Sequence, residues 1–119
     1  MDKFITYQSR LSGTVTVSGS KNAALPMMAA TILTDDVCTI RNVPDLMDVR
    51  TMIKILEVLG KKVSFHDNVL RISGTASKKC VAPYRLVRTM RASFCCLGSL
   101  LARRKKAKVA LPGGCVIGP

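Results

Sequence analysis

The sequence predicts a mixed α/β (α+β) fold that is built from βαβαββ units. Segments in which apolar and β-branched residues alternate, as expected of strands, are interleaved with segments in which apolar residues recur every three or four positions, as expected of helices. The composition is that of a folded domain, because 48% of the 119 residues are hydrophobic and only 22% are charged. A chain of this length suits one domain of roughly 100–150 residues, or a part of a larger one.

The first unit is expected to begin with a strand and a helix. Residues 13–19 alternate with β-branched Thr and Val, which predicts a strand closed by a turn of small residues. Residues 23–33 form an apolar run that predicts a helix. Either Ser20 or Asn22 could supply its N-cap, and Pro26 is acceptable only in its first turn.

A second strand, a second helix and a hairpin complete this unit. Residues 37–42 predict the strand, and Asp45 is the expected N-cap of a helix that runs to residue 59, with Gly60 as its stop. Residues 61–65 and 69–73 flank a short turn and predict the hairpin. The helix is expected to bury the apolar positions that keep helical spacing, which are Val49, Met52, Ile53, Leu56 and Leu59.

A second unit is expected to begin at Pro83 with a long helix that ends near Ala102. The basic run at residues 103–108 then leads into a strand at 109–111. The chain stops at Pro119 within a loop rich in Gly and Pro, so we expect a fragment of a longer protein. The buried stripe of the helix should consist of large side chains at helical spacing, namely Leu86, Met90, Phe94, Leu97 and Leu101.

Positive charge is concentrated in the second half of the chain. The 19 Lys and Arg outnumber the 7 Asp and Glu for a formal charge of +12, and no acid lies beyond residue 67. Such asymmetry suggests a nucleic acid, an anionic membrane or an anionic substrate, without choosing among them. The longest apolar runs, at 23–33 and 94–102, are far shorter than the ~20 residues of a membrane span. The N-terminus lacks the apolar segment of a signal peptide.

The five cysteines fall into two groups. No pair has the C-x-x-C spacing of a zinc or redox motif, so we expect no metal site. Cys38, Cys80, Cys95 and Cys96 are interpreted as reduced core thiols of a cytoplasmic protein. Cys115 instead follows a Pro-Gly-Gly segment that favours a mobile loop. Nearby cations should lower the pKa of its thiol below ~8.5, which suits either a nucleophile as thiolate or a proton donor as thiol.

Two other groups of residues are suited to binding an anion. The Ser-Gly-Ser-Lys-Asn segment at 18–22 leads into a helix N-terminus, where free N–H groups and Lys21 favour a phosphate or carboxylate, although a solvated lysine has the same pattern. Arg85, Arg88 and Arg91 share one helix face at i, i+3 spacing. This face either binds an anion, pairs with acids elsewhere or is solvated, and Arg91 is our choice for a ligand contact.

Three segments in order resemble the enolpyruvyl transferase family, in particular its branch that acts on UDP-N-acetylglucosamine. They are Ser-Gly-Ser-Lys-Asn-Ala-Ala-Leu-Pro at 18–26, Thr-Met-Arg-Ala-Ser at 89–93 and Leu-Pro-Gly-Gly-Cys-Val-Ile-Gly at 111–118. The related shikimate-pathway enzymes share the fold, but the Lys-Asn-Ala-Ala-Leu-Pro and Pro-Gly-Gly-Cys segments argue against them. The resemblance spans nearly the whole chain.

The resemblance implies two domains of βαβαββ units, forming an inside-out α/β barrel fold with the active site in the cleft between them. On that basis, residues of about 1–20 hold a strand of the second domain. Residues of about 21–82 form the first unit, and about 83–119 start the second unit and end in the Pro-Gly-Gly-Cys loop. The rest of the second domain lies outside this chain, so the fragment is expected to be inactive alone.

The resemblance also implies an enzyme and its reaction. The 3′-hydroxyl of UDP-N-acetylglucosamine adds to C2 of phosphoenolpyruvate while C3 gains a proton, and phosphate then leaves, in the first committed step of peptidoglycan biosynthesis. By position, Lys21 and Asn22 match residues that contact phosphoenolpyruvate, and Arg91 matches one that contacts UDP-N-acetylglucosamine. Cys115 matches the proton donor that fosfomycin alkylates. No metal, organic cofactor, nucleic acid or membrane partner is implied.

A small basic nucleic-acid-binding module is the alternative interpretation. The basic run at 103–108 motivates it, since phosphate neutralisation gives strong, salt-dependent binding. Against it, only 4% of the residues are aromatic, which leaves few stacking platforms, and no zinc-finger or RNA-recognition signature is present. The run is more basic than the family resemblance leads us to expect.

Overall fold

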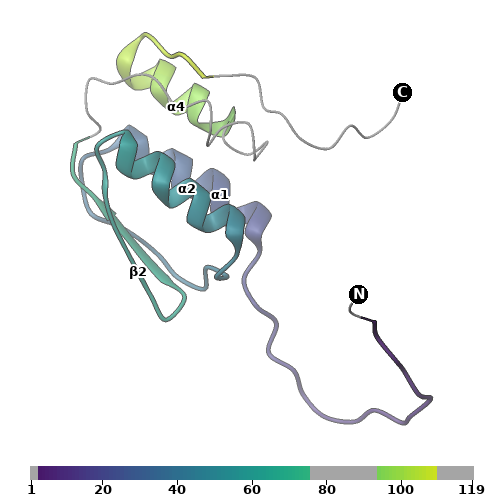
Figure 1. Cartoon of the computed structure of the whole chain (residues 1–119). Coiled ribbons are helices and arrows are strands. Elements are labelled where there is room, and N and C mark those ends of the chain that lie inside the picture. The colour runs from purple at the N-terminus through teal and green to yellow at the C-terminus, as the bar shows by residue number, and fades with distance from the viewer. Residues whose placement is uncertain (1–2, 76–93, 110–119) are drawn as a thin grey trace, which may run out of the picture.

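A computed structural model describes residues 3–75 and 94–109, and the account below concerns these residues. Three helices and one sheet form successive layers, with α1 and α2 between the sheet and α4 (Figure 1). The strands are antiparallel and lie in the order β1-β3-β2. The elements are α1 (Lys21–Ala30), the 3₁₀-helix η1 (Thr31–Leu33), β1 (Cys38–Ile40), α2 (Met47–Val58), β2 (Lys62–His66), β3 (Val69–Ser73) and α4 (Cys95–Arg104).

The strand predicted at residues 13–19 is not present, so that prediction is wrong for this structure. Residues 3–18, the N-terminal arm, are solvent-exposed and belong to no helix or strand. The arm leads away from the layered body (Figure 1). Alternating β-branched residues favour an extended backbone, but a strand also needs a neighbouring edge to pair with. The described unit is therefore αβαββ.

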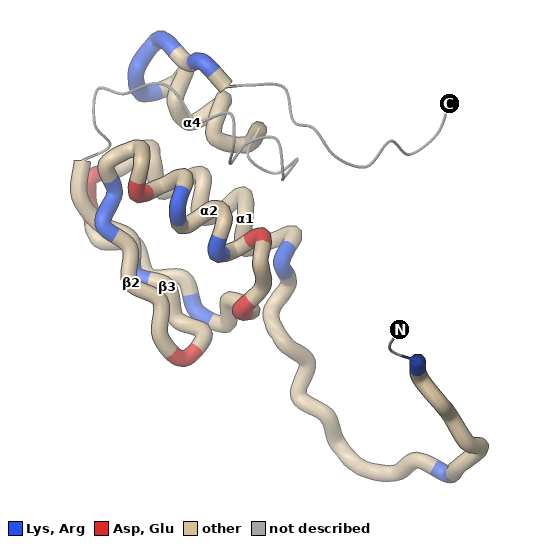
Figure 2. Tube along the Cα trace, in the orientation of Figure 1, with Lys and Arg blue, Asp and Glu red and all other residues tan. Residues whose placement is uncertain are grey.

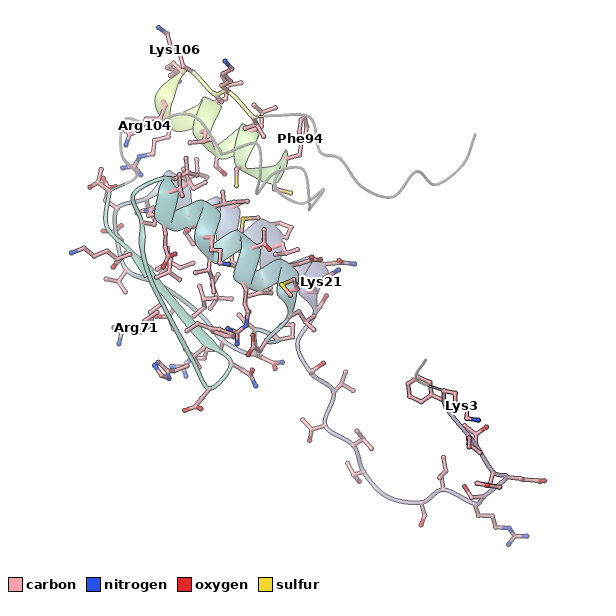
Figure 3. All side chains as sticks on the ribbon, in the orientation of Figure 1. Lys3, Lys21, Arg71, Phe94, Arg104 and Lys106 are labelled. Carbon is pink, nitrogen blue, oxygen red and sulfur yellow. The ribbon has the colours of Figure 1, made fainter. Side chains whose placement is uncertain are left out.

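The predicted hairpin is confirmed and supplies one wall of the core. Val63 pairs with Ile72 and Phe65 with Leu70 across β2 and β3, which directs these side chains to the same face of the sheet. The opposite face is polar and includes Arg71, which points away from the helices (Figure 3). One buried and one exposed face is typical of an antiparallel sheet covered by helices on one side.

The helices supply the other wall of the core. Of the α2 positions expected to be buried, Val49, Met52 and Leu56 are fully buried, as is Leu59 just after the helix, whereas Ile53 is only partly buried. The complete core cluster consists of Ala24, Leu25, Met28, Ala29, Ile32, Val43, Val49, Met52, Ile55, Leu56, Leu59, Leu70, Ile72, Cys96 and Leu100. Helical periodicity therefore located the buried face of α2 and missed only Ile55.

The two ends of α2 differ in how well they were predicted. Gly60 has φ 98°, and its N–H donates to Glu57 O while that of Lys61 donates to Leu56 O, so the expected stop is confirmed as a Schellman motif. The N-cap is Leu46 rather than Asp45 and makes no side-chain cap. The Asp45 carboxylate instead accepts two hydrogen bonds from Arg50, at 2.7 and 2.5 Å. A bidentate guanidinium partner thus replaces the expected capping role.

The N-cap of α1 is Ser20, whose hydroxyl accepts a hydrogen bond from the N–H of Ala23 at 3.3 Å. This decides between the two candidate caps. It also places Pro26 in the second turn rather than the first, contrary to expectation. Proline has no N–H to donate to the carbonyl of Asn22. The helix continues past it because its opposite face is buried against the core.

The predicted buried stripe of the last helix is wrong where the structure describes it. Cys96 and Leu100 are buried, whereas Phe94 and Leu101 are 47% and 51% exposed and Leu97 is only half-buried. Apolar residues lie on two faces of this helix. The face with Cys96 and Leu100 is buried where α4 packs against α1 and η1, and the face with Phe94 and Leu101 is largely exposed. The helix ends at Arg104 instead of near Ala102, and Leu86 and Met90 lie outside the described residues.

The cysteines do not all lie in the core as expected. Cys96 is buried, with its Sγ 3.8 Å from Sδ of Met52, and burial raises the pKa of its thiol to about 12. Cys38 is half-buried, and Cys95 is exposed, which corrects its interpretation as a core thiol. Adjacent helical positions lie about 100° apart on the helix, so Cys95 and Cys96 cannot share one face. Cys80 and Cys115 lie outside the described residues.

Arg103, which belongs to the basic run at 103–108, contacts residues at the C-terminal end of η1. Arg103 donates to the carbonyl of Ile32 at 3.3 Å and forms an ion pair with Asp35. The buried Lys61 donates to the carbonyl of Thr34 at 2.5 Å. Cations at a helix C-terminus satisfy its last carbonyls and stabilise its dipole. Val109 packs against the core without entering a strand, and the rest of the predicted strand at 109–111 lies outside the described residues.

Candidate functional site

The N-terminal ends of α1 and α2 meet at an ion pair. Lys21 is the first residue of α1, and its Nζ lies 2.7 Å from Oδ2 of Asp48 in the first turn of α2. Lys21 lies where the N-terminal arm enters the body (Figure 3). The side chains of Lys21 and Asp48 are 41% and 33% exposed. The lysine is therefore held in place while its ammonium stays open to solvent.

This arrangement is suited to receiving an anion. The free N–H groups and the dipole of α1 present positive charge at its N-terminus, and Lys21 adds a full charge there. A partly exposed ion pair contributes only about 0–1 kcal/mol, so a phosphate or carboxylate can exchange with Asp48 as the partner of the ammonium. The ion pair with Asp48 gives this lysine a partner, and its side chain remains partly solvated.

Sequence reasoning missed Asp48. A signal for it was present, since an acid in the first turn of a predicted helix is favoured by the helix dipole. What could not be seen from the sequence is that the first turns of two different helices lie side by side. The contact joins residues 27 positions apart.

The other predicted site residues are only partly placed. Asn22 is the second residue of α1 and is exposed beside Lys21. Arg91 and Cys115 lie outside the described residues, as do Arg85 and Arg88. The roles predicted for all four candidate site residues, namely Lys21, Asn22, Arg91 and Cys115, stay predictions.

A hollow of about 630 Å³ lies between α2 and the β2–β3 hairpin, apart from the Lys21–Asp48 pair. It is lined by Phe65 and Ile53 together with charged side chains, among them Arg50 and Lys54. The hydrogen bond from Arg50 holds the pKa of Asp45 below its usual value, so the cation at this end of the hollow is already paired with a carboxylate. This hollow is therefore less suited to an anion than the N-terminus of α1.

The described part of the chain holds neither a metal-binding cluster nor a membrane-spanning helix. Within residues 3–75 and 94–109, no group of three or more His, Cys, Asp or Glu side chains is arranged to hold a metal ion. No helix in these ranges combines the length and apolar character needed to cross a membrane.

Comparison with known proteins identifies the family. A profile of the family described as EPSP synthase (3-phosphoshikimate 1-carboxyvinyltransferase) matches residues 5–119. The chain belongs to this family. This match agrees with the resemblance of the three sequence segments to the enolpyruvyl transferase family, to which the shikimate-pathway enzymes also belong.

Curated relatives of the chain carry a more specific name. UDP-N-acetylglucosamine 1-carboxyvinyltransferase of Elusimicrobium minutum is 50% identical over 119 residues, which are 99% of this chain and 28% of that protein. The protein of the same name from Chlorobaculum parvum is 56% identical over 111 residues, 92% of this chain and 26% of that protein. The chain thus spans little more than a quarter of the length of the curated relatives it matches.

The fold is also shared with a solved member. The enolpyruvyl transferase NikO from Streptomyces tendae superposes with a TM-score of 0.70 and 25% identity, over 79% of this chain and 22% of that one. The predicted fold class is therefore confirmed as a partial α/β fold of the enolpyruvyl transferase type.

Proposed function

We propose that this chain is the N-terminal part of a UDP-N-acetylglucosamine 1-carboxyvinyltransferase. The names of its relatives support this, since several of them share about half of its residues over nearly its full length. The structural observation that carries the proposal is the position of Lys21 at the N-terminus of α1, beside the first turn of α2. A partly exposed lysine side chain at the adjoining N-termini of two helices is suited to a small substrate with two anionic groups, such as the phosphate and carboxylate of phosphoenolpyruvate.

The domain organisation belongs to the same proposal. Residues of about 1–20 would contribute a strand to a second domain, about 21–82 form the first unit and about 83–119 start the second unit. The N-terminal arm supports this division, because it is rich in β-branched residues, exposed and without a strand partner in the described part of the chain. The partner that this chain requires is then the remaining part of its own protein.

Lys21 and Asn22 are proposed to bind phosphoenolpyruvate. The ammonium of Lys21 exchanges Asp48 for the phosphate and carboxylate of the substrate. The amide of Asn22, one residue further into α1, donates a hydrogen bond to the same substrate. Arg91 is proposed to bind UDP-N-acetylglucosamine through its guanidinium, which matches phosphate geometry.

The chemistry is an addition followed by an elimination. The 3′-hydroxyl of the sugar gives up its proton to water as its oxygen forms a bond to C2 of phosphoenolpyruvate, and the electron pair of the C2–C3 double bond takes the thiol proton of Cys115 at C3. The bond between C2 and the phosphate oxygen then breaks, C3 loses a proton, and the enolpyruvyl ether and inorganic phosphate are released. A general acid works best with a pKa near the working pH, which a moderately lowered thiol pKa provides. No metal or organic cofactor takes part in this scheme.

The biological setting follows from that reaction. It is the first committed step of peptidoglycan synthesis, so the proposed role lies in cell-wall formation, cell shape and division, and in the cytoplasm. The nucleic-acid alternative receives no support from the described residues. Lys and Arg are spread over α2, the sheet and the end of α4 (Figure 2), and Arg103 of the basic run is engaged with Asp35 and Ile32.

The proposal is tested by measuring phosphate release from the complete gene product with both substrates. Activity that requires both phosphoenolpyruvate and UDP-N-acetylglucosamine supports it, and activity with shikimate 3-phosphate instead would contradict it. Lys21→Ala should weaken phosphoenolpyruvate binding, whereas Lys54→Ala, which removes an exposed lysine from the middle of α2, should not. Residues 1–119 alone should release no phosphate.

A further inference from the structure

We propose that Gly19 is a positioning residue for Lys21, because its close contact with the main chain of Asn42 sets the path by which the chain enters α1. The inference rests on the proposed function, in which Lys21 binds phosphoenolpyruvate. It goes beyond that function, because neither Gly19 nor Asn42 is proposed to contact a substrate.

The contact leaves no room for a side chain. A Cβ atom built on Gly19 would lie 1.6 Å from the carbonyl oxygen of Asn42 and 2.8 Å from its carbonyl carbon. Atoms in favourable contact lie about 3.5–4.0 Å apart. Any residue other than glycine would therefore have to move the two chain segments apart. The requirement comes from close approach of two backbones, which is one of the roles that only glycine can fill.

Asn42 cannot easily move away from this contact. It adopts a left-handed conformation with φ 56°, and the next residue, Val43, is buried in the core. The N–H of Val43 also donates to the carbonyl of Asn68 at 2.8 Å, which ties this loop to the turn of the β2–β3 hairpin. The loop is thus anchored by core packing on one side and by the hairpin on the other, so the strain of a larger residue at 19 falls on the entrance to α1.

A displacement at Gly19 reaches Lys21 within two residues. Ser20 caps α1 through its hydroxyl, and Lys21 follows as the first helical residue with its ammonium against Asp48. A shift of about 1 Å can reduce a reaction rate by up to about 100-fold when it misplaces a binding group. We expect a substituted Gly19 to move the cap and the ammonium together.

Gly98 provides a matched control on the same chain. Among the atoms of residues 3–75 and 94–109, apart from the nearby backbone of α4 itself, none lies within 4 Å of a Cβ built on Gly98. Replacing either glycine by alanine makes the same chemical change, but among the described residues a neighbour is met at Gly19 and not at Gly98. A difference between the two variants therefore reports the contact with Asn42 and not the general effect of losing a glycine.

The decisive measurement is the KM for each substrate in the complete gene product. Gly19→Ala is expected to raise the KM for phosphoenolpyruvate by about 10- to 100-fold, while its KM for UDP-N-acetylglucosamine and both KM values of Gly98→Ala stay unchanged. Combining Gly19→Ala with Asn42→Gly lets residue 42 adopt backbone angles that turn its carbonyl away from residue 19, at the expense of the hydrogen bond from Val43 to Asn68, and should restore part of the lost affinity. A folded Gly19→Ala protein with an unchanged KM for phosphoenolpyruvate overturns the inference.

Should Gly19→Ala fail to fold, the double variant decides. A folded double variant locates the clash at Asn42, and a double variant that also fails to fold overturns the inference.

A chemical readout separates this inference from the proposed function. The rate at which an amine-specific acetylating reagent modifies Lys21 is followed by mass spectrometry, with the exposed Lys54 as internal reference. Gly19→Ala should accelerate acetylation of Lys21, because its ion pair is disturbed, and an unchanged rate counts against the inference. If acetylation accelerates but Lys21→Ala leaves the KM for phosphoenolpyruvate unchanged, the positioning role stands and the proposed function fails.

Discussion

The ammonium nitrogen of Lys21 lies 2.7 Å from a carboxylate oxygen of Asp48, so the first residue of α1 is held by the first turn of α2. Neither residue is buried, and each stands at the positive end of a helix dipole. The dipole favours Asp48 and opposes Lys21. The lysine is therefore at a position where an additional anion lowers the electrostatic energy.

The first prediction concerns the two members of this pair. Asp48→Asn should change the KM for phosphoenolpyruvate by no more than about fivefold, because a partly exposed ion pair contributes only about 0–1 kcal/mol. Lys21→Ala should raise the same KM by about 10- to 100-fold, since it removes a charged hydrogen-bond donor of about 1.5–3 kcal/mol. Steady-state kinetics of the complete gene product compares the two. Equal losses in both variants would indicate that Asp48 itself takes part in the reaction.

The second prediction concerns stability at alkaline pH. Burial raises the pKa of the Cys96 thiol from 9.0 to about 12. Between these values the unfolded chain loses the proton first, so the free energy of unfolding should fall as the pH rises, by at most about 1.4 kcal/mol per pH unit. Urea unfolding at several pH values measures the slope. Cys96→Ala should show a shallower slope over this interval, and an identical slope would contradict the assignment.

The third prediction separates the cysteines by reactivity. In the complete gene product, fosfomycin should modify Cys115 and leave Cys95 and Cys96 unmodified. Iodoacetamide, which needs only an accessible thiol, should also modify Cys95, because Cys95 is exposed, but not the buried, neutral Cys96. Peptide mass spectrometry distinguishes the three sites. Fosfomycin adducts at Cys95 or Cys96 would argue against Cys115 as the reactive thiol.

The fourth prediction is that Gly98→Ala stabilises the chain. Gly98 lies inside α4, and in the described part of the chain no other segment comes within 4 Å of a Cβ added to it. Alanine is favoured over glycine inside a helix by about 0.8–1.0 kcal/mol, so the free energy of unfolding should rise by about that amount. Urea unfolding of the two chains measures the difference. A loss of stability would mean that another segment packs closely on this side of α4.

The fifth prediction assigns a structural role to part of the basic run. Arg103→Ala should lower the free energy of unfolding by about 1–2 kcal/mol, because the carbonyl of Ile32 and the carboxylate of Asp35 lose their partner. Lys106→Ala serves as the control and should change it by less than about 0.5 kcal/mol, since Lys106 points away from the body (Figure 3). Equal effects would show that Arg103 acts only through net charge.

Local patterns predicted the elements that depend on local interactions. The hairpin, the buried face of α2 and its stop at Gly60 follow from residue alternation, helical periodicity and the left-handed conformation that glycine adopts without strain. Lys21 and Asn22 were likewise expected at a helix N-terminus and lie there. These features need no knowledge of which other segment lies nearby.

The errors arose where two local solutions compete. Asp45 is a good N-cap by type, but Arg50 is within reach and forms two hydrogen bonds to the same carboxylate. On α4 the large side chains of Phe94 and Leu101 indicated the buried stripe, whereas Cys96 and Leu100 face the core. Residue type indicates which cap or which helix face is favoured locally. The side chains and helices that pack nearby determine which one forms.

The sequence by itself determined the family, the order of the elements from α1 to β3 and the residues proposed to bind substrate, because each is encoded in short segments. Only the tertiary structure decided that Asp48 partners Lys21, that Gly19 touches Asn42 and that residues 13–19 pair with no strand in the described part of the chain. These relations join segments far apart in the chain. Their energies depend on which backbones and charges approach one another, and a local pattern carries no record of that approach.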